Sequence, residues 1–242
     1  MDKVLKLYKE MGETPLNVIE RFKEENPEYS EEKMTYAGRL DPMAEGLLLV
    51  LCGDEIYNKE KYLGLKKEYE FEVLFGVSTD TGDALGIVGV VESKIISEEV
   101  LKEVSKVFVG KRIQKYPDYS SKTINGVPMW KKARLGDLSN EIPDHEIEVF
   151  NLELISTKKL IGNEIKEIVI EKIKKIDGDF RQMEIINSWQ EKIDDMGQFF
   201  VAKFIANVSS GTYIRVLANE IAEEVNTKGI AFSIKRTKIG DF

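Results

Sequence analysis

Residues 34–54, MTYAGRLDPMAEGLLLVLCGD, constrain the fold of this 242-residue chain more than any other stretch. The apolar run LLLVL at 47–51 is typical of a buried strand. Just before this run, Pro42 keeps Asp41 out of helical geometry and removes one backbone N–H donor. Asp41 is therefore predicted to lie at a stiff, non-helical bend on the edge of a core. Taken alone, an Asp-Pro pair is typical of a turn.

Composition limits the classes of protein to which the chain can belong. With 42% hydrophobic residues it can bury a sizeable core, as one large domain or two small ones. Cys52 is the single cysteine and His145 the single histidine, which excludes an internal disulfide and leaves too few ligands for a zinc site. The N-terminus lacks a signal-peptide core, and no apolar run approaches the roughly 20 residues of a membrane-spanning helix. We therefore expect a soluble, cytoplasmic protein.

The charge of the chain is acidic overall but unevenly distributed. A net charge of -8 and a pI near 5.1 argue, by themselves, against binding of a polyanion. Residues 111–134, here called the basic segment, contain seven cations and a single acid, Asp118. Tyr116, Tyr119 and Trp130 are interleaved with these cations, as expected where phosphates are neutralised and bases are stacked. A local nucleic-acid-binding face on an acidic body is therefore compatible with the sequence.

Hydrophobic periodicity predicts most of the remaining elements. Strands are expected over residues 4–8, 67–75, 147–155, 165–176 and 200–208, and helices over residues 14–26, 97–110, 180–193 and 215–225. Residues 79–86 are predicted to form an ordered turn between strands, in which Thr and Asp side chains bond backbone donors. This turn lacks the acid spacing of a calcium loop and the glycine pattern of a nucleotide loop. No function is predicted for residues 160–199.

Six short segments, in order along the chain, resemble the motifs of TruB-type tRNA pseudouridine synthases. Residues 38–48 match G-x-L-D-P-x-A-x-G-x-L, residues 67–69 with 76–86 match K-x-Y and G-x-x-T-D-T-x-D-x-x-G, and residues 209–217 match S-x-G-T-Y-I-R-x-L. The words at residues 9–15, 114–134 and 234–242 are similar to K-P-x-G-x-T-S, to the family's Q-x-P-P-x-Y-S-A word and to L-x-R-T-x-x-G-x-F. The resemblance covers most of the chain.

This resemblance implies roles for three residues. Asp41 would be the catalytic residue, Tyr69 would stack on the target base and assist proton exchange, and Arg215 would pair with Asp41. An adjacent guanidinium favours the charged carboxylate, so the pairing would keep Asp41 ionised and fix its direction. Taken alone, Tyr69 is a core aromatic of an alternating strand, and Arg215 forms a structural salt bridge. The resemblance implies neither a metal nor an organic cofactor.

The resemblance also implies an RNA-binding surface, with some departures from the family pattern. The expected RNA-binding residues are Tyr36, Arg39, Tyr119, Lys122, Lys131, Lys132 and Arg134. Tyr36 stands where the family has His, and Arg39 gives the Arg-Leu-Asp form of sister families that act on ribosomal RNA. Lys122 lies one position early, and Trp130 replaces a Tyr. Tyr36 still offers a flat face to a splayed-out base.

Together these inferences imply an α+β pseudouridine synthase fold, with a large, mainly antiparallel mixed sheet flanked by helices. Residues 1–242 are expected to form one catalytic domain without a C-terminal, PUA-like RNA-binding domain. The implied function is isomerisation of the T-loop uridine at tRNA position 55, with the tRNA T-arm as partner, no obligate protein partner and no membrane. The alternatives are a synthase acting on ribosomal RNA and a non-catalytic protein that binds and remodels tRNA.

Overall fold

The computed structural model describes residues 2–92, 94, 96–137 and 142–242. Its strands are β1 (Val4–Lys9), β2 (Met34–Ala37), β3 (Glu45–Cys52), β4 (Lys67–Phe75), β5 (Val77–Thr79), β6 (Val88–Val91), β7 (Gly110–Lys115), β8 (Thr123–Ile124), β9 (Val127–Pro128), β10 (Asp144–Ile161), β11 (Gln198–Val208) and β12 (Gly229–Ile239). Its helices are α1 (Pro15–Glu25), η1 (Pro27–Tyr29), η2 (Gly53–Asn58), α2 (Lys59–Leu63), α3 (Glu98–Val107), α4 (Met129–Arg134), α5 (Gly162–Lys174), α6 (Gln182–Lys192) and α7 (Ile214–Glu224).

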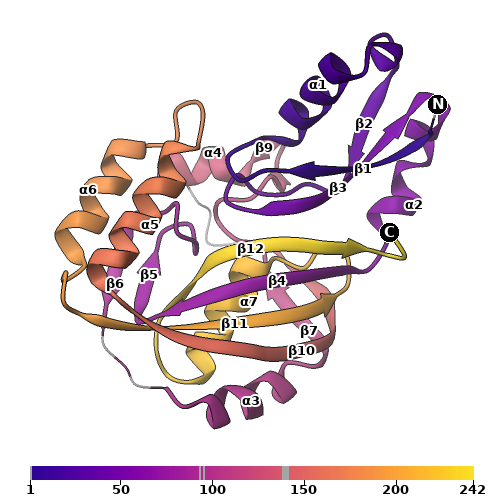
Figure 1. Ribbon diagram of the computed structural model, residues 1–242. Helices are drawn as coiled ribbons and strands as arrows, with labels where there is room; N and C mark the ends of the chain where they lie inside the picture. Colours follow the sequence, from indigo (N-terminus) through magenta and orange to yellow (C-terminus); the bar gives the residue numbers. More distant parts are fainter. Residues whose placement is uncertain (1, 93, 95, 138–141) are drawn as a thin grey trace.

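An eight-stranded sheet forms the centre of the molecule (Figure 1). Its order is β1-β3-β12-β4-β11-β10-β7, and β2 pairs separately with β3. Neighbouring strands are antiparallel except for β3 and β12, which run parallel where Gly46 lies opposite Arg236. The α+β class with a mainly antiparallel mixed sheet is therefore confirmed.

Strand β3 is buried on both of its faces, which explains why its sequence is continuously apolar. Leu48 and Val50 join a cluster with Ile19 of α1, whereas Leu49 and Leu51 pack in a second cluster with α2 and the end of β12. The run predicted as a buried strand is thus the element on which the N-terminal third of the chain is assembled. The strand begins immediately after the bend that contains Asp41, so its packing fixes one end of that bend.

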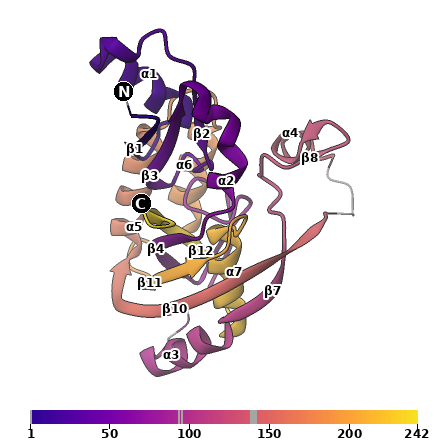
Figure 2. The same ribbon diagram turned by 90° about the vertical axis from the view of Figure 1, so that its right-hand side faces the viewer.

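Helices cover both faces of the central sheet (Figure 2). Alternate residues of a strand point to opposite faces, so Tyr69 and Glu70 of β4 face different layers. Tyr69 lines a pocket with Ile214, at the start of α7, whereas Glu70 lines a separate cavity of about 900 Å³ with Lys172 of α5. Within the described residues, no helix is long and apolar enough to cross a membrane.

Residues 165–176 were predicted as a strand, and this prediction was wrong. Most of them belong to helix α5, and β10 instead continues to residue 161. The many β-branched side chains favoured a strand on composition. However, the fully buried residues recur at every fourth position, which is the helical period: they are Ile165, Val169 and Ile173. Packing of this face against the sheet overrides the intrinsic preference of isoleucine.

Helix α6 lies where residues 180–193 were predicted to be helical, and it supports the turn at residues 79–86. The buried Trp189 side chain donates a hydrogen bond from Nε1 to the Gly86 carbonyl oxygen at 3.1 Å. Ser188 Oγ accepts the Val88 N–H at 3.1 Å. The segment for which the sequence predicted no function therefore anchors one side of this turn.

Candidate active site

Asp41 lies in the bend between β2 and β3, and the chain around it is held by backbone hydrogen bonds. The Asp41 carbonyl oxygen accepts the Ala44 N–H at 3.0 Å, and the Pro42 carbonyl oxygen accepts the Gly12 N–H at 2.9 Å. Gly12 has a φ of +98°, and a Cβ atom there would overlap the Lys175 carbonyl oxygen at the end of α5. Only glycine allows both this φ and this close approach to Lys175. Through the Gly12 N–H bond to Pro42, the turn after β1 braces the Asp41 bend.

Two buried cations hold the same bend through its carbonyl oxygens. Arg236 of β12 donates from Nε to the Leu47 carbonyl oxygen at 2.8 Å and from Nη2 to the Gly38 carbonyl oxygen at 3.2 Å. Lys9 donates from Nζ to the Ala44 carbonyl oxygen at 2.6 Å. Burial lowers the pKa of Lys9 to about 8, despite opposing effects of nearby acids. The bend thus has cationic donors on both sides of Asp41.

Arg215 connects Asp41 to the rest of the site. Its Nε atom lies 2.8 Å from Oδ2 of Asp41 and 3.6 Å from Oδ2 of Asp83, so one guanidinium is shared by two carboxylates. Its Nη1 and Nη2 atoms donate to the carbonyl oxygens of Thr81 and Tyr119, at 2.8 and 2.9 Å. The Arg215 side chain is 4% exposed, whereas that of Asp41 is 38% exposed. Asp41 therefore faces the solvent side of a buried ionic cluster.

Asp83 is the second carboxylate of this cluster, and sequence reasoning missed it. Its Oδ1 atom accepts hydrogen bonds from Thr81 Oγ1 at 2.8 Å and from the Leu85 N–H at 2.9 Å, as the rigid turn at residues 79–86 was predicted to do. Burial raises the pKa of Asp83, and the Arg215 guanidinium offsets part of that effect. Burial also disfavours the charge of Arg215, but the two carboxylates outweigh it and raise the Arg215 pKa. The sequence signal that could have selected Asp83 is its place in residues 76–86, the segment that matches G-x-x-T-D-T-x-D-x-x-G.

A pocket of about 250 Å³ opens beside Asp41 and is lined by Tyr69. Its other lining residues are Gly38, Arg39, Leu40, Ala44, Leu63, Lys67, Ser121, Ser209, Ser210, Gly211, Thr212, Tyr213, Ile214, Ile234 and Arg236. Asp41 is the only acid in this lining, against three cations. Tyr69 is 8% exposed, which agrees with a core aromatic as much as with a pocket wall. The structure brings Asp41, Tyr69 and Arg215 together, while their chemical roles stay predictions.

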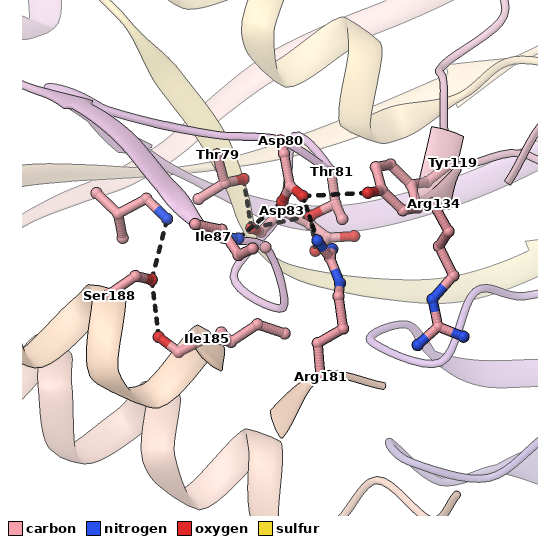
Figure 3. A network of polar contacts seen from close by, with 12 residues as sticks. Thr79, Asp80, Thr81, Asp83, Ile87, Tyr119, Arg134, Arg181, Ile185 and Ser188 are labelled. Carbon is pink, nitrogen blue, oxygen red and sulfur yellow. Dashed lines mark hydrogen bonds and ion pairs between the residues drawn. The ribbon is translucent and has the colours of Figure 1, made fainter. Parts of the chain in front are cut away.

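The basic segment is fastened to the site by a second ionic cluster. Figure 3 shows the Asp80 carboxylate between Tyr119 and Arg181: Tyr119 donates its hydroxyl at 3.2 Å, and Arg181 Nη1 lies 2.8 Å from the same oxygen. The Arg181 guanidinium also lies 5.1 Å from the centre of the Tyr119 ring. Arg134 Nη2 lies 3.3 Å from the Asp179 carboxylate. Residues 179–181, which precede α6, therefore position two of the predicted RNA-binding residues through contacts within the chain.

The other predicted RNA-binding residues of the basic segment are three lysines, of which Lys122 and Lys131 are exposed and Lys132 is half-buried. Hairpin β8–β9 and helix α4 project from the body in Figure 2. Lys131 and Trp130 lie on this projection, with Lys131 Nζ 5.5 Å from the Trp130 ring centre, and Lys132 follows on the same helix. Lys122 Nζ lies 4.8 Å from the Tyr116 ring centre. Cations and aromatic rings are thus paired at this surface, and their contact with RNA stays a prediction.

Tyr36, which departs from the family pattern, is surrounded by cations. Arg39 donates from Nη2 to the Tyr36 hydroxyl at 3.1 Å, and its guanidinium lies 5.9 Å from the ring centre. Lys59 Nζ lies 5.1 Å from the same centre. Sequence reasoning did not select Lys59, because it follows the motif by many residues and is brought back by α2. In the described part of the chain, no cluster of three or more His, Cys, Asp or Glu side chains is placed to hold a metal ion.

A comparison with protein families matches residues 27–172 to the family model described as "TruB family pseudouridylate synthase (N terminal domain)". The tRNA pseudouridine synthase B of Aquifex aeolicus is 31% identical over 241 residues, covering 100% of this chain and 69% of that protein. The tRNA pseudouridine synthase B of Rickettsia akari is 28% identical, covering 87% of this chain and 58% of that protein. The tRNA pseudouridine synthase 4 of Saccharomyces cerevisiae is 30% identical, covering 82% of this chain and 58% of that protein. The chain thus spans little more than half the length of two of these relatives.

Solved structures show the same fold. The structure described as a Cbf5-Nop10-Gar1 complex superimposes with a TM-score of 0.61 at 19% identity, covering 99% of this chain and 49% of that chain. An H/ACA RNP bound to a substrate RNA containing 2′-deoxyuridine gives a TM-score of 0.57 at 18% identity, covering 99% of this chain and 48% of that chain. At this level of identity the likeness concerns the fold alone.

Replacing Arg215 with methionine should make stability depend on the ionisation of Asp83. The folded-state pKa of Asp83 should rise further above its unfolded value of about 3.9, because its counter-charge is gone. Above a pH of about 3.9, the unfolded chain releases the Asp83 proton while the folded chain keeps it. The unfolding free energy should therefore fall as pH rises. We expect Arg215→Met to lose about 3–5 kcal/mol near neutral pH, measured by urea unfolding across the acidic range.

The matched control is Asp83→Asn in the Arg215→Met background. The double variant has no ionisable group at position 83, so its unfolding free energy should lack this extra pH dependence. Identical pH profiles for the single and double variants would contradict the assignment of the penalty to Asp83.

Proposed function

The chain belongs to the TruB family of pseudouridylate synthases, and on that basis we propose that it converts uridine to pseudouridine in tRNA, at the T-loop uridine. The observation that carries the proposal is the ionic cluster in which Arg215 Nε lies 2.8 Å from Asp41, at the side of a pocket lined by Tyr69. A partly exposed carboxylate with a buried counter-ion is suited to act on a group that enters this pocket.

The reaction exchanges one bond of the base for another. The C1′–N1 bond breaks with its electron pair left on the base, the uracil rotates, and C5 bonds to C1′. C5 then loses its proton and N1 gains one, so the product is an isomer of the substrate. No atom is added or removed.

Asp41 acts in its ionised form in either role open to it, as nucleophile at the anomeric carbon or as base on the sugar. Arg215 places its positive charge beside one carboxylate oxygen of Asp41, because its Nε atom lies 2.8 Å from Oδ2. The target base must leave its stack to reach this carboxylate, which costs a few kcal/mol. Tyr69 offsets part of that cost by stacking on the base, and its hydroxyl assists the final proton transfer.

The T-arm of tRNA is the partner that fits the charge distribution. The projection formed by β8, β9 and α4 carries Lys131 and Lys132 beside Trp130. Cations there neutralise backbone phosphates, and exposed aromatic rings stack on unpaired bases. Tyr36 and Arg39 lie nearer Asp41 and would meet nucleotides that flank the target.

The function is tested by mapping pseudouridine at single-nucleotide resolution in an unmodified tRNA transcript after incubation with the purified protein. We expect signal at the T-loop uridine and none in a transcript with cytidine at that position. Asp41→Asn should abolish the signal because it removes the anion and keeps the shape. Asp54→Asn, at an exposed acid of η2, serves as the matched control and should retain activity.

Other outcomes separate the alternatives. Signal in total RNA but not in tRNA would replace the substrate by a ribosomal RNA uridine and keep Asp41 as the catalyst. Binding of tRNA without pseudouridine in any RNA would replace the enzyme by a tRNA-remodelling protein.

Charge removal on α4 tests the RNA-binding surface. Lys131→Gln with Lys132→Gln should weaken tRNA binding, mostly at low salt, and reduce the slope of log affinity against log salt by about 1 per lysine. The control pair is Lys102→Gln with Lys106→Gln, two exposed lysines of α3 that lie away from the projection. A slope equal to that of the unmodified protein for the α4 variant would place the RNA on another surface.

A further inference from the structure

Lys67 is a buried cation in the pocket that the functions assigned above do not use. It is the first residue of β4 and is 6% exposed. Its Nζ atom donates to the Leu63 carbonyl oxygen at 2.5 Å and to Ser210 Oγ at 3.2 Å. No ion pair among the described residues includes it. An ammonium group has three N–H donors, so the two acceptors leave one donor free for a group in the pocket.

The position of Lys67 on its strand relates it to the target base. Lys67 and Tyr69 are two residues apart on β4, so their side chains leave the same face about 7 Å apart along the strand. Both line the pocket beside Asp41. A base stacked on Tyr69 therefore presents one of its edges toward Lys67, and the edges of uracil carry the O2 and O4 carbonyl groups.

Burial indicates which part of the RNA can reach Lys67. Phosphates stay with the nucleic-acid backbone, and at the rim they meet exposed cations such as Arg39. Lys67 lies inside, behind Ser210 and the end of α2, so only the group that enters the pocket can contact it. That group is the unstacked base.

The charge of the pocket fits a transient anion. When the C1′–N1 bond breaks, its electron pair stays on the base, and the negative charge spreads over N1, O2 and O4. Arg215 is already paired with two carboxylates, and Arg236 is bonded to backbone carbonyl oxygens. Arg236 is also buried and also lacks a carboxylate partner, but each of its three nitrogen atoms donates to a backbone carbonyl oxygen, whereas Lys67 keeps one N–H donor free beside Tyr69. Burial, followed by the Arg236 cation, lowers the pKa of Lys67 to about 8, which leaves it mainly protonated at neutral pH.

We propose that the Lys67 ammonium donates a hydrogen bond to a carbonyl oxygen of the target uracil and stabilises the negative charge on the base while it is detached from the sugar. This role rests on the proposed function and adds a catalytic residue to it. The bond is strongest when the base is anionic, since charge-assisted hydrogen bonds exceed neutral ones. Lys67 therefore favours the detached state over the bound substrate, which accelerates the chemical step.

The first test separates rate from affinity. Lys67→Met keeps the length and removes the charge, and we expect single-turnover pseudouridine formation to slow about 100-fold at saturating protein, with tRNA affinity unchanged. Lys67→Arg should recover part of the rate because it restores a cationic donor. Lys172→Met is the matched control: this half-buried lysine of α5, whose pKa is also lowered by burial, lines the separate cavity and should leave the rate unchanged. Thermal unfolding checks that each variant is folded.

The second test identifies the contact itself. The target uridine is replaced by 2-thiouridine or 4-thiouridine in a ligated transcript, since sulfur accepts hydrogen bonds less well than oxygen. If Lys67 bonds one of these oxygens, the matching thio substitution and Lys67→Met should be strongly non-additive in rate. A purely structural role for Lys67 predicts that the two losses multiply.

Three results would overturn the role of Lys67. These are multiplicative losses at both thio positions, weakened tRNA affinity with an unchanged rate, as for a phosphate contact, and a Lys67→Met rate equal to that of the unmodified protein. Each leaves the proposed function intact, provided that the unmodified protein forms pseudouridine and Asp41→Asn does not. If the unmodified protein forms none, the proposed function fails, and the role of Lys67 fails with it.

Discussion

A guanidinium buried between two carboxylates is the interaction on which this site depends. Arg215 is 4% exposed, and its ion pairs with Asp41 and Asp83 compensate for the loss of water. The two carboxylates differ in exposure: Asp83 is enclosed and fixes the guanidinium, whereas Asp41 keeps one side open to the pocket. Removal of Arg215 would leave both carboxylates without a counter-charge, so Asp41 and Asp83 both depend on this one side chain.

The fold serves to bring that unit together from distant parts of the chain. Asp41 follows β2, Asp83 lies in the turn before β6, and Arg215 opens α7. Buried cations hold backbone carbonyl oxygens around Asp41, and Trp189 of α6 holds the turn of Asp83 from its other side. Burial of these groups carries a cost, visible in the lowered pKa of Lys9, and the well-packed sheet beneath them supplies the compensating stability.

Sequence reasoning succeeded where one pattern had one structural meaning. The apolar run of β3, the alternation in β4 and the period of α7 each specified an element, and the motif words selected Asp41 and Arg215 before their distance was known. It failed for α5, because the β-branched residues there favour a strand by intrinsic preference but are spaced for one face of a helix. Only the tertiary contacts decide between helix and strand. It also missed the role of Asp83: a turn Asp and a counter-ion look alike until Arg215 is placed beside it. Lys59 and Arg181 contact Tyr36 and Asp80 through long-range packing that no local pattern encodes.

In the proposed function, one unstacked uridine occupies the pocket between Asp41 and Tyr69. A crystal structure of the Asp41→Asn protein with an unmodified T-arm stem-loop tests it most directly, since the substitution should stop the reaction and keep the pocket. We expect the target base to lie on the Tyr69 ring, with its ribose at residue 41 and an edge toward Lys67. A target base that stays in its own stack, or an RNA bound across the face of α5, would contradict it.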